Sequence, residues 1–303
     1  MTTPGPLEPS ETRTLPSSGG TTLHVELFRP PTPPRAVAVV VHGYAEHIGR
    51  YREVAHVLVA GGLLVVGFDL RGHGRSSGRR GHIQRFTDYL DDLDAALALA
   101  RELAPGLPVI LVAHSNGGLI VLRALTDERR RPSVAGAVIS SPFLGLKLAV
   151  PKAQVWAARI ASRVLPAFSQ KNGLKVEQIT SDKGMQAARL ADTLCHDVAS
   201  ARWFTEAMEA QAHVRARATS IAVPTTWLIG GADPIADAQL ASALARTVPG
   251  ADVHLLDGFL HEVFNEVERA RPFALMTKAV DGFMPPAAPP VAPAASPPAS
   301  PPV

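Results

Sequence analysis

The chain has 303 residues, of which 46% are hydrophobic and 19% charged, so it can bury a substantial core. A formal net charge of +3, from 30 basic and 27 acidic residues, is too balanced for a nucleic-acid-binding surface. The single cysteine, Cys195, excludes an internal disulfide and fits a reducing compartment such as the cytoplasm. We expect neither a signal peptide nor a membrane span, because no apolar run reaches about 18 residues.

The two ends of the chain have a low-complexity composition. Residues 1–20 are rich in Pro, Ser, Thr and Gly, and residues 284–303 are nearly all Pro, Ala and Ser. Such segments bury too little apolar surface to offset the entropy lost on ordering. We therefore predict that both are disordered and that the folded domain spans residues 21–283.

Within that domain, short apolar runs alternate with helical patterns. Runs that are apolar on both faces are typical of parallel strands covered on both sides, whereas residues 21–28 alternate like an antiparallel edge strand. The predicted parallel strands are residues 36–41, 63–68, 109–113, 134–140, 225–229 and 253–256. This pattern predicts an α/β fold with a mostly parallel central sheet and helices on both faces.

The interval between the fourth and fifth of these runs is different. From residue 143 to about residue 222 the sequence has helical periodicity and loops but no parallel-strand pattern. We expect an inserted helical cap over about 143–222, with the core formed by residues 21–142 and 223–283.

Ser115 lies where the strand 109–113 passes into a helix over 119–125. A strand, a small-x-Ser-x-small turn and a helix are the context of a nucleophile elbow, in which crowding around the serine demands small flanking residues. Gly117 meets that demand, and Ala113 stands where the usual pattern has glycine. The segment predicts a serine nucleophile for acyl transfer.

A serine nucleophile needs a base and an acid that orients the base. Asp233 follows the strand 225–229 and His261 follows the strand 253–256, giving the chain order Ser, Asp, His that the α/β-hydrolase sheet requires. Asp237 and Asp257 remain alternatives for the acid. Three other histidines are weaker candidates for the base. His24 and His254 lie inside predicted strands, and the side chain of His114 is expected to point away from the serine at the tight turn.

The oxyanion formed during acyl transfer needs backbone donors. One is expected at the amide of Asn116, directly after the nucleophile. The other is expected at the amide of Tyr44, because His42 and Gly43 form a turn after the first parallel strand.

Three stretches together resemble the monoacylglycerol lipase and lysophospholipase branch of the α/β-hydrolases: VVVHGYAEHIGRY (39–51), DLRGHGRS (69–76) and HSNGG (114–118). The resemblance covers nearly the whole chain between the tails. It implies a serine ester hydrolase that cleaves single-acyl lipids through an acyl-enzyme, with Ser115, Asp233 and His261 as the triad. Glu46 and Arg50 fall where that branch shapes the pocket for the alcohol part of the substrate.

The resemblance also implies an architectural role for the loop 69–76, in which Arg71 and His73 fix the strand end. Two departures concern the fine geometry of the elbow: Ala113 replaces glycine, and Asn116 replaces the usual methionine.

Other functions remain open. A short-chain esterase or a proline-releasing aminopeptidase would use the same triad, and a non-catalytic lipid-binding protein would be expected to lack one of its members. An epoxide hydrolase is disfavoured because Ser115 stands where such enzymes place an aspartate. No metal or cofactor is expected, and the expected partner is a small lipid ester.

One segment of the predicted cap has the pattern of an amphipathic helix, running from Pro151 to Leu165. Its apolar face either packs within the cap or rests on a membrane or micelle, which would make the protein peripheral to a membrane. The apolar face consists of Ala153, Trp156, Ala157, Ile160 and Val164, and the basic flank of Lys152, Arg159 and Arg163.

Overall fold

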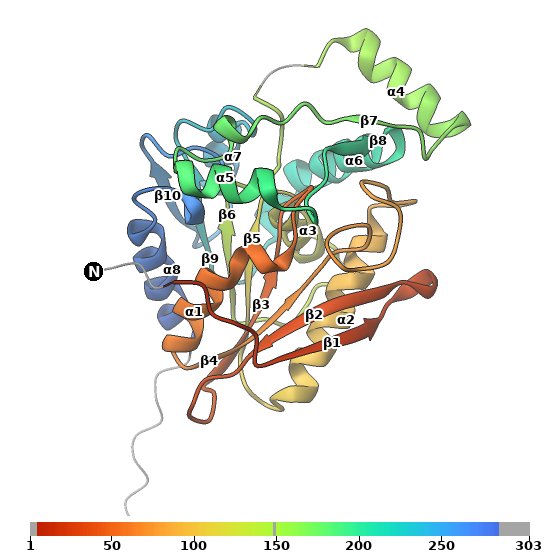
Figure 1. The fold of residues 1–303 in the computed structure, drawn as a ribbon. Coiled ribbons are helices and arrows are strands. Elements are labelled where there is room, and N and C mark those ends of the chain that lie inside the picture. Colours follow the sequence, from red (N-terminus) through yellow and green to blue (C-terminus); the bar gives the residue numbers. More distant parts are fainter. Residues whose placement is uncertain (1–4, 148–149, 285–303) are drawn as a thin grey trace, which may run out of the picture.

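The computed structural model describes residues 5–147 and 150–284, and its centre is an eight-stranded sheet with helices on both faces (Figure 1). The strand order is β1-β2-β4-β3-β5-β6-β9-β10. β1, β2 and β4 pair antiparallel, and all other neighbours in this sheet pair parallel. The strands are β1 (Glu11–Pro16), β2 (Thr22–Phe28), β3 (Ala36–Val41), β4 (Leu63–Phe68), β5 (Val109–His114), β6 (Gly136–Ser140), β9 (Thr225–Gly230) and β10 (Asp252–Leu256).

Alternate side chains of each central strand enter two different cores. Val39 and Val41 of β3 belong to one apolar cluster, while Ala38 and Val40 belong to the other. Both faces of the strand are thus buried, which explains the uninterrupted apolar runs. The predicted mostly parallel α/β sheet is confirmed, with the expected boundaries at 36–41 and 63–68.

Five helices cover the sheet. The first core includes side chains of α2, α3 and α7, and the second includes side chains of α1 and α8. Their bounds are α1 (Arg52–Ala60), α2 (Thr87–Leu103), α3 (Asn116–Leu125), α7 (Ala238–Ala245) and α8 (Ala270–Phe283).

The N-terminal segment differs from the prediction. β1 pairs along its whole length with β2. The prediction that residues 1–20 are disordered is therefore wrong for residues 11–20. The prediction of an edge strand at residues 21–28 is also wrong, because β1 lies outside β2 in the sheet. The backbone ladder stabilises this polar strand, Leu15 packs against the first core, and the hydroxyl of Ser17 donates to Asp92 at 2.6 Å. The predicted C-terminal tail lies outside the described residues beyond Met284.

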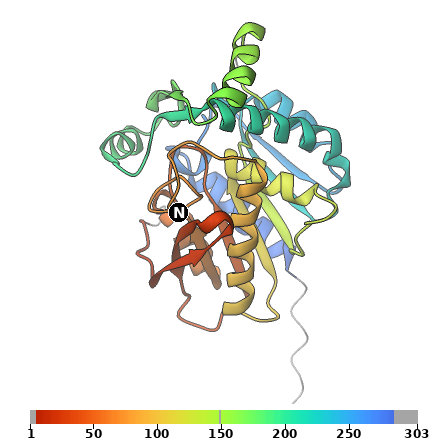
Figure 2. The ribbon, with the colours of Figure 1, turned by 90° about the vertical axis from the view of Figure 1, so that its right-hand side faces the viewer.

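We call residues 143–222 the cap. Figure 1 and Figure 2 show it as a layer above the carboxyl ends of the parallel strands, with α4 outermost. A short antiparallel pair, β7 and β8, lies within it and was not expected from the helical periodicity. The larger elements of the cap are α4 (Lys152–Val164), β7 (Ser169–Lys171), α5 (Lys183–Ala191), β8 (Val198–Ser200) and α6 (Ala201–Arg217).

Candidate active site

Ser115 occupies the turn between β5 and α3 with φ 51° and ψ −113°. A positive φ is unfavourable for a residue with a side chain, and such strain persists where surrounding contacts fix it. Here the Ser115 amide donates to Ser140 O at 2.9 Å, and the Phe143 amide donates to Ser115 O at 3.0 Å. A Cβ atom on Gly117 would lie 2.2 Å from Val41 O, so only glycine fits where the helix crosses β3.

The side chains of Ser115, His261 and Asp233 form one buried hydrogen-bonded chain. His261 Nε2 lies 2.8 Å from Ser115 Oγ, and His261 Nδ1 donates to Asp233 Oδ2 at 2.6 Å. The other carboxylate oxygen of Asp233 accepts the amides of Ile235 and Ala236 at 2.8 and 3.0 Å. These bonds fix the carboxylate, which in turn fixes the orientation of the imidazole.

The alternative acids lie elsewhere. Asp237 caps α7 by accepting the amide of Leu240 at 3.0 Å, and Asp257 is exposed. His254 pairs with Asp252 at 2.9 Å. None of these side chains joins the chain of hydrogen bonds at Ser115.

The charges around His261 suit its role as a base for Ser115. Burial acts to lower the pKa of His261, but the charge and hydrogen bond of Asp233 outweigh it, so the pKa lies above its ordinary value. Burial likewise acts to raise the pKa of Asp233, and His261 holds it below the usual value. His114 lies beside His261, with ring centroids 4.8 Å apart, but contacts Ser140 Oγ at 2.9 Å. Burial and the neighbouring His261 lower the pKa of His114 to about 4, which keeps it neutral.

The amides of Tyr44 and Asn116, the two predicted oxyanion donors, have no hydrogen-bond partner among the described residues. Asn116 is the first residue of α3, where the amide has no partner within the helix. Gly43 and Tyr44 line the same cavity as Ser115, on the loop after β3.

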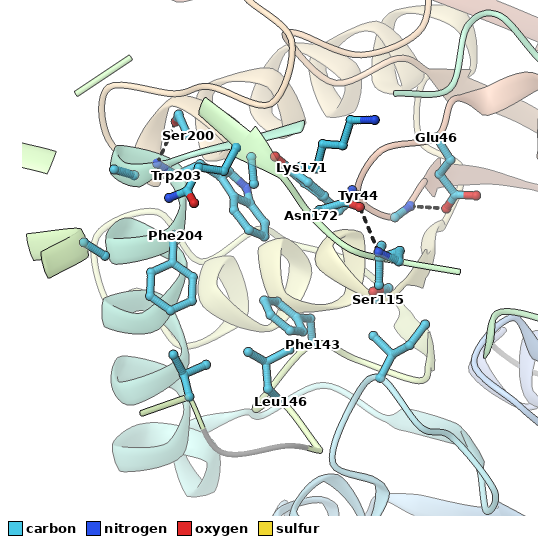
Figure 3. A pocket seen from close by; sticks show the side chains of 18 of the residues that line it. Tyr44, Glu46, Ser115, Phe143, Leu146, Lys171, Asn172, Ser200, Trp203 and Phe204 are labelled. Atoms are coloured by element: carbon cyan, nitrogen blue, oxygen red, sulfur yellow. Dashed lines mark hydrogen bonds between the residues drawn. The ribbon is translucent and has the colours of Figure 1, made fainter. Parts of the chain in front are cut away.

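A cavity of about 680 Å³ opens above Ser115, between the core and the cap. Figure 3 shows Glu46 to one side of Ser115 and Phe143, Leu146 and Phe204 to the other. The apolar side is extended by small cap side chains, among them Ala157 and Ala161 of α4, and by Trp203. The cavity therefore has an apolar arm and a polar end, with the nucleophile between them.

The polar end is built on ion pairs. Glu46 accepts the amide of Gly43 at 2.6 Å and the side chain of Arg50 at 3.1 Å. Arg50 also donates to Glu262 at 2.6 Å. Glu46 and Glu262 line the cavity, whereas Arg50 does not line it and contacts the cavity wall through these two carboxylates.

The sequence analysis missed Glu262 and Arg189. Glu262 directly follows His261, and that adjacency was the available signal. Arg189 reaches the cavity from α5, with Nη1 3.8 Å from Glu262 Oε1. No local pattern marks a residue that arrives from another element of the fold.

The loop 69–76 is tied down by ionic and backbone contacts, as the resemblance implied. Arg71 donates to both oxygens of Asp92, at 2.8 and 2.6 Å. Asp69 accepts the amide of Ile48 at 2.8 Å, which links this loop to the segment after β3.

Among the described residues, one group of side chains has the spacing of metal ligands: His47, Asp192 and Cys195. It does not fit a metal ion. His47 Nε2 already donates to Asp192 at 2.6 Å, and Arg189 lies 3.7 Å from Cys195 Sγ. Burial raises the pKa of the Cys195 thiol to about 12, so this thiol is protonated in the metal-free protein.

The apolar face of α4 is exposed rather than packed within the cap. The side chains of Trp156 and Val164 are 67% and 70% exposed, and the neighbouring Leu165 is 62% exposed. Among the described residues, no helix is both long and apolar enough to cross a membrane.

A parallel sheet with a buried Ser–His–Asp chain in the order Ser115, Asp233, His261 at its carboxyl edge defines a serine hydrolase of the α/β-hydrolase class. The chain belongs to the family described as serine aminopeptidase, S33, which matches residues 32–268. The predicted family and fold are thereby confirmed, and the protein is an enzyme of this class.

Relatives of the chain carry lipase names. A monoacylglycerol lipase of Mycolicibacterium smegmatis is 32% identical over 254 residues, covering 83% of this chain and 90% of that protein. Phospholipase YtpA of Bacillus subtilis is 30% identical over 254 residues, covering 83% and 97%. The crystal structure of a monoacylglycerol lipase from Paleococcus ferrophilus matches with a TM-score of 0.78 and 28% identity, covering 86% of this chain and 99% of that chain.

Proposed function

We propose that the protein hydrolyses the ester bond of single-acyl lipids, with monoacylglycerol as the preferred substrate. The observation that carries this proposal is the hydrogen-bonded chain of Ser115, His261 and Asp233 beneath a cavity with one apolar arm and one polar end. The apolar arm suits one acyl chain. The lipase names of the relatives support the same substrate class.

In the proposed mechanism, Ser115 Oγ attacks the ester carbonyl while His261 Nε2 takes its proton. The charge of Asp233 stabilises the imidazolium that forms. The amides of Tyr44 and Asn116 donate to the carbonyl oxygen as it becomes negative. His261 then protonates the departing alcohol, and a water molecule, activated by the same imidazole, releases the fatty acid from Ser115.

The polar end favours an uncharged polyol over a phosphate-bearing head group. Glu46 and Glu262 face this end of the cavity, and carboxylates accept hydrogen bonds from hydroxyl groups. A polyol can donate to these carboxylates and also accept from Arg189, which lines the same end beside Glu262, whereas a phosphodiester offers no donor to either carboxylate. We therefore place the glycerol part of the substrate here, with Arg50 acting indirectly by holding the two carboxylates.

We further propose that the exposed face of α4 rests on the lipid surface from which the substrate is drawn. Trp156, Ile160 and Val164 are exposed, and Ala157 and Ala161 of the same helix line the acyl arm, so the acyl chain would have a short path from the surface to Ser115. The basic side chains along the flank suit anionic head groups: Lys152, Arg159 and Arg163.

The test is a substrate panel combined with covalent labelling. A fluorophosphonate should label the wild type but not Ser115→Ala, and monoacylglycerol should be cleaved faster than lysophospholipid, triacylglycerol or an aminoacyl amide. If the aminoacyl amide were cleaved faster than monoacylglycerol, the protein would be assigned as an aminopeptidase and not as a lipase. Absence of labelling would remove the serine mechanism altogether.

A further inference from the structure

One segment of the cap binds three residues of the loop after β3: Tyr44, Ala45 and His47. We call residues 43–47 the oxyanion loop and residues 189–198 the strap. Tyr44 Oη donates to Val198 O at 2.8 Å, and the His196 amide donates to Ala45 O at 3.2 Å. In the two remaining contacts, Arg189 Nη2 donates to Ala45 O at 3.3 Å and His47 Nε2 donates to Asp192 at 2.6 Å.

The strap acts where the oxyanion loop is strained. Ala45 is fully buried and has φ 63°, a conformation that residues with a side chain rarely adopt. Its carbonyl receives two donors from the strap, the Arg189 side chain and the His196 amide. Because such a conformation persists only where its surroundings enforce it, the strap contacts have a mechanical role beyond packing.

We propose that the strap holds the oxyanion loop in the conformation that aims the Tyr44 amide at the reacting carbonyl. Tyr44, through its hydroxyl, and Arg189 are the positioning residues. This inference rests on the proposed function, in which the Tyr44 amide is an oxyanion donor. On this proposal, the position of the Tyr44 amide depends on where the cap docks. A displaced cap would leave the triad intact, but the Tyr44 amide would no longer be aimed at the reacting carbonyl.

The hydroxyl of Tyr44 can be removed without removing its ring contacts. The ring stacks on Trp203 with centroids 3.8 Å apart, and phenylalanine keeps that stack. It loses the 2.8 Å bond to Val198 O of the strap and the longer 3.2 Å contact with Gly81 O, so Arg189→Met, which leaves both contacts of the Tyr44 hydroxyl in place, tests the strap independently. Tyr89 provides the matched control. It is a fully buried tyrosine whose ring lies 6.4 Å from that of His73, which in turn lies beside the Tyr44 ring. Its hydroxyl has no hydrogen-bond partner in the described part of the chain, so Tyr89→Phe removes a buried hydroxyl without removing a hydrogen bond.

Arg189 has a matched control as well. Arg189→Met removes the donor to Ala45 O, and Arg189→Lys restores a cation of similar reach. Arg202 is another arginine of the cap, and its side chain donates at 2.7 Å to Ser162 O, within the cap itself. Arg202→Met therefore reports the general cost of disturbing the cap without touching the oxyanion loop.

The experiment measures kcat and KM on a soluble short-chain ester, the melting temperature, and the inhibition constant of a trifluoromethyl ketone, whose adduct with Ser115 places an oxyanion in the hole. For Tyr44→Phe and Arg189→Met we expect kcat to fall about 10- to 100-fold, as for a donor misplaced by about 1 Å. KM should change less than about threefold, and the inhibition constant of the ketone should rise by the same factor as kcat falls. Arg189→Lys should recover part of the loss, and both controls should stay within about twofold of the wild type.

Unchanged kcat and unchanged ketone inhibition in Tyr44→Phe and Arg189→Met would overturn the proposed role of the strap. So would losses that follow only the folded fraction and the melting temperature, or equal losses in Arg202→Met. These outcomes are separable from a failure of the proposed function, because fluorophosphonate labelling of the wild type at Ser115 tests the nucleophile before any variant is made.

Discussion

The triad and the outer face of α4 are opposite exceptions to the rule that apolar side chains lie inside and polar ones outside. Ser115, His261 and Asp233 are polar and only 7%, 6% and 3% exposed, whereas Trp156 and Val164 are apolar and about two thirds exposed. The first exception is stabilised by hydrogen bonds within the protein. The second leaves most of its apolar surface uncovered by the described residues, which is the observation behind the proposed lipid contact. We assign the chemistry to the first region and propose that the second meets the lipid surface that supplies the substrate.

The largest expected effect breaks the first region. Ser115→Ala, His261→Ala and the double variant should each lower kcat by about 10⁴ or more, because the triad acts as a unit. Turnover of a soluble ester at saturating concentration is the measurement. Additive losses in the double variant would mean that His261 does not act through Ser115.

Replacing the acid should cost less than removing the nucleophile. Asp233→Asn keeps the shape of the side chain but removes the charge that stabilises the imidazolium, so kcat should fall by about 10³ to 10⁴. Asp237→Asn is the matched control, since Asp237 only caps α7, and should stay within a few-fold of the wild type. The reverse ranking would move the acid to Asp237.

The sequence predicted those features best that depend on residues close together in the chain. The strands and Ser115 depend on local patterns: apolar runs, and glycine at Gly117, where any Cβ would meet Val41 O. The order of Ser115, Asp233 and His261 follows from chain topology, so it too could be inferred.

Features that depend on distant contacts were missed. β1 is polar in composition and is held by its backbone ladder to β2, which composition does not reveal. Arg189 reaches the cavity from α5 of the cap, and the ion pair of Arg50 with Glu262 joins residues 212 positions apart, so neither contact has a local signal in the sequence. Exposure of α4 likewise depends on where the cap sits.

The pH dependence sharpens the electrostatic description of the triad. His261 must be neutral to accept the serine proton, so kcat/KM should fall about tenfold per pH unit below its pKa. Because Asp233 holds that pKa above the ordinary value of 6.5, the half-maximal point should lie above pH 6.5. Asp233→Asn removes the raising charge and leaves burial, so its residual activity should titrate at lower pH than the wild type. A wild-type midpoint below pH 6.5 would contradict this account.

The smallest expected effect concerns the exposed face of α4. Trp156 and Ile160 do not line the cavity, so Trp156→Ala and Ile160→Asp should leave kcat and KM for a soluble short-chain ester unchanged. Because both side chains are exposed, the free energy of unfolding should change by no more than about 0.5 kcal/mol.

Hydrolysis of monooleoylglycerol in vesicles of phosphatidylcholine and phosphatidylglycerol should fall about tenfold, the factor expected when roughly 1.5 kcal/mol of apolar burial is lost. Val267→Asp is the matched control, because Val267 is an apolar residue outside the cap that is 65% exposed. If Val267→Asp lowered the vesicle rate equally, the effect would come from added negative charge. If Trp156→Ala lowered the soluble and vesicle rates together with the melting temperature, the face would be part of the folded core, and the contrast between the two regions would not hold.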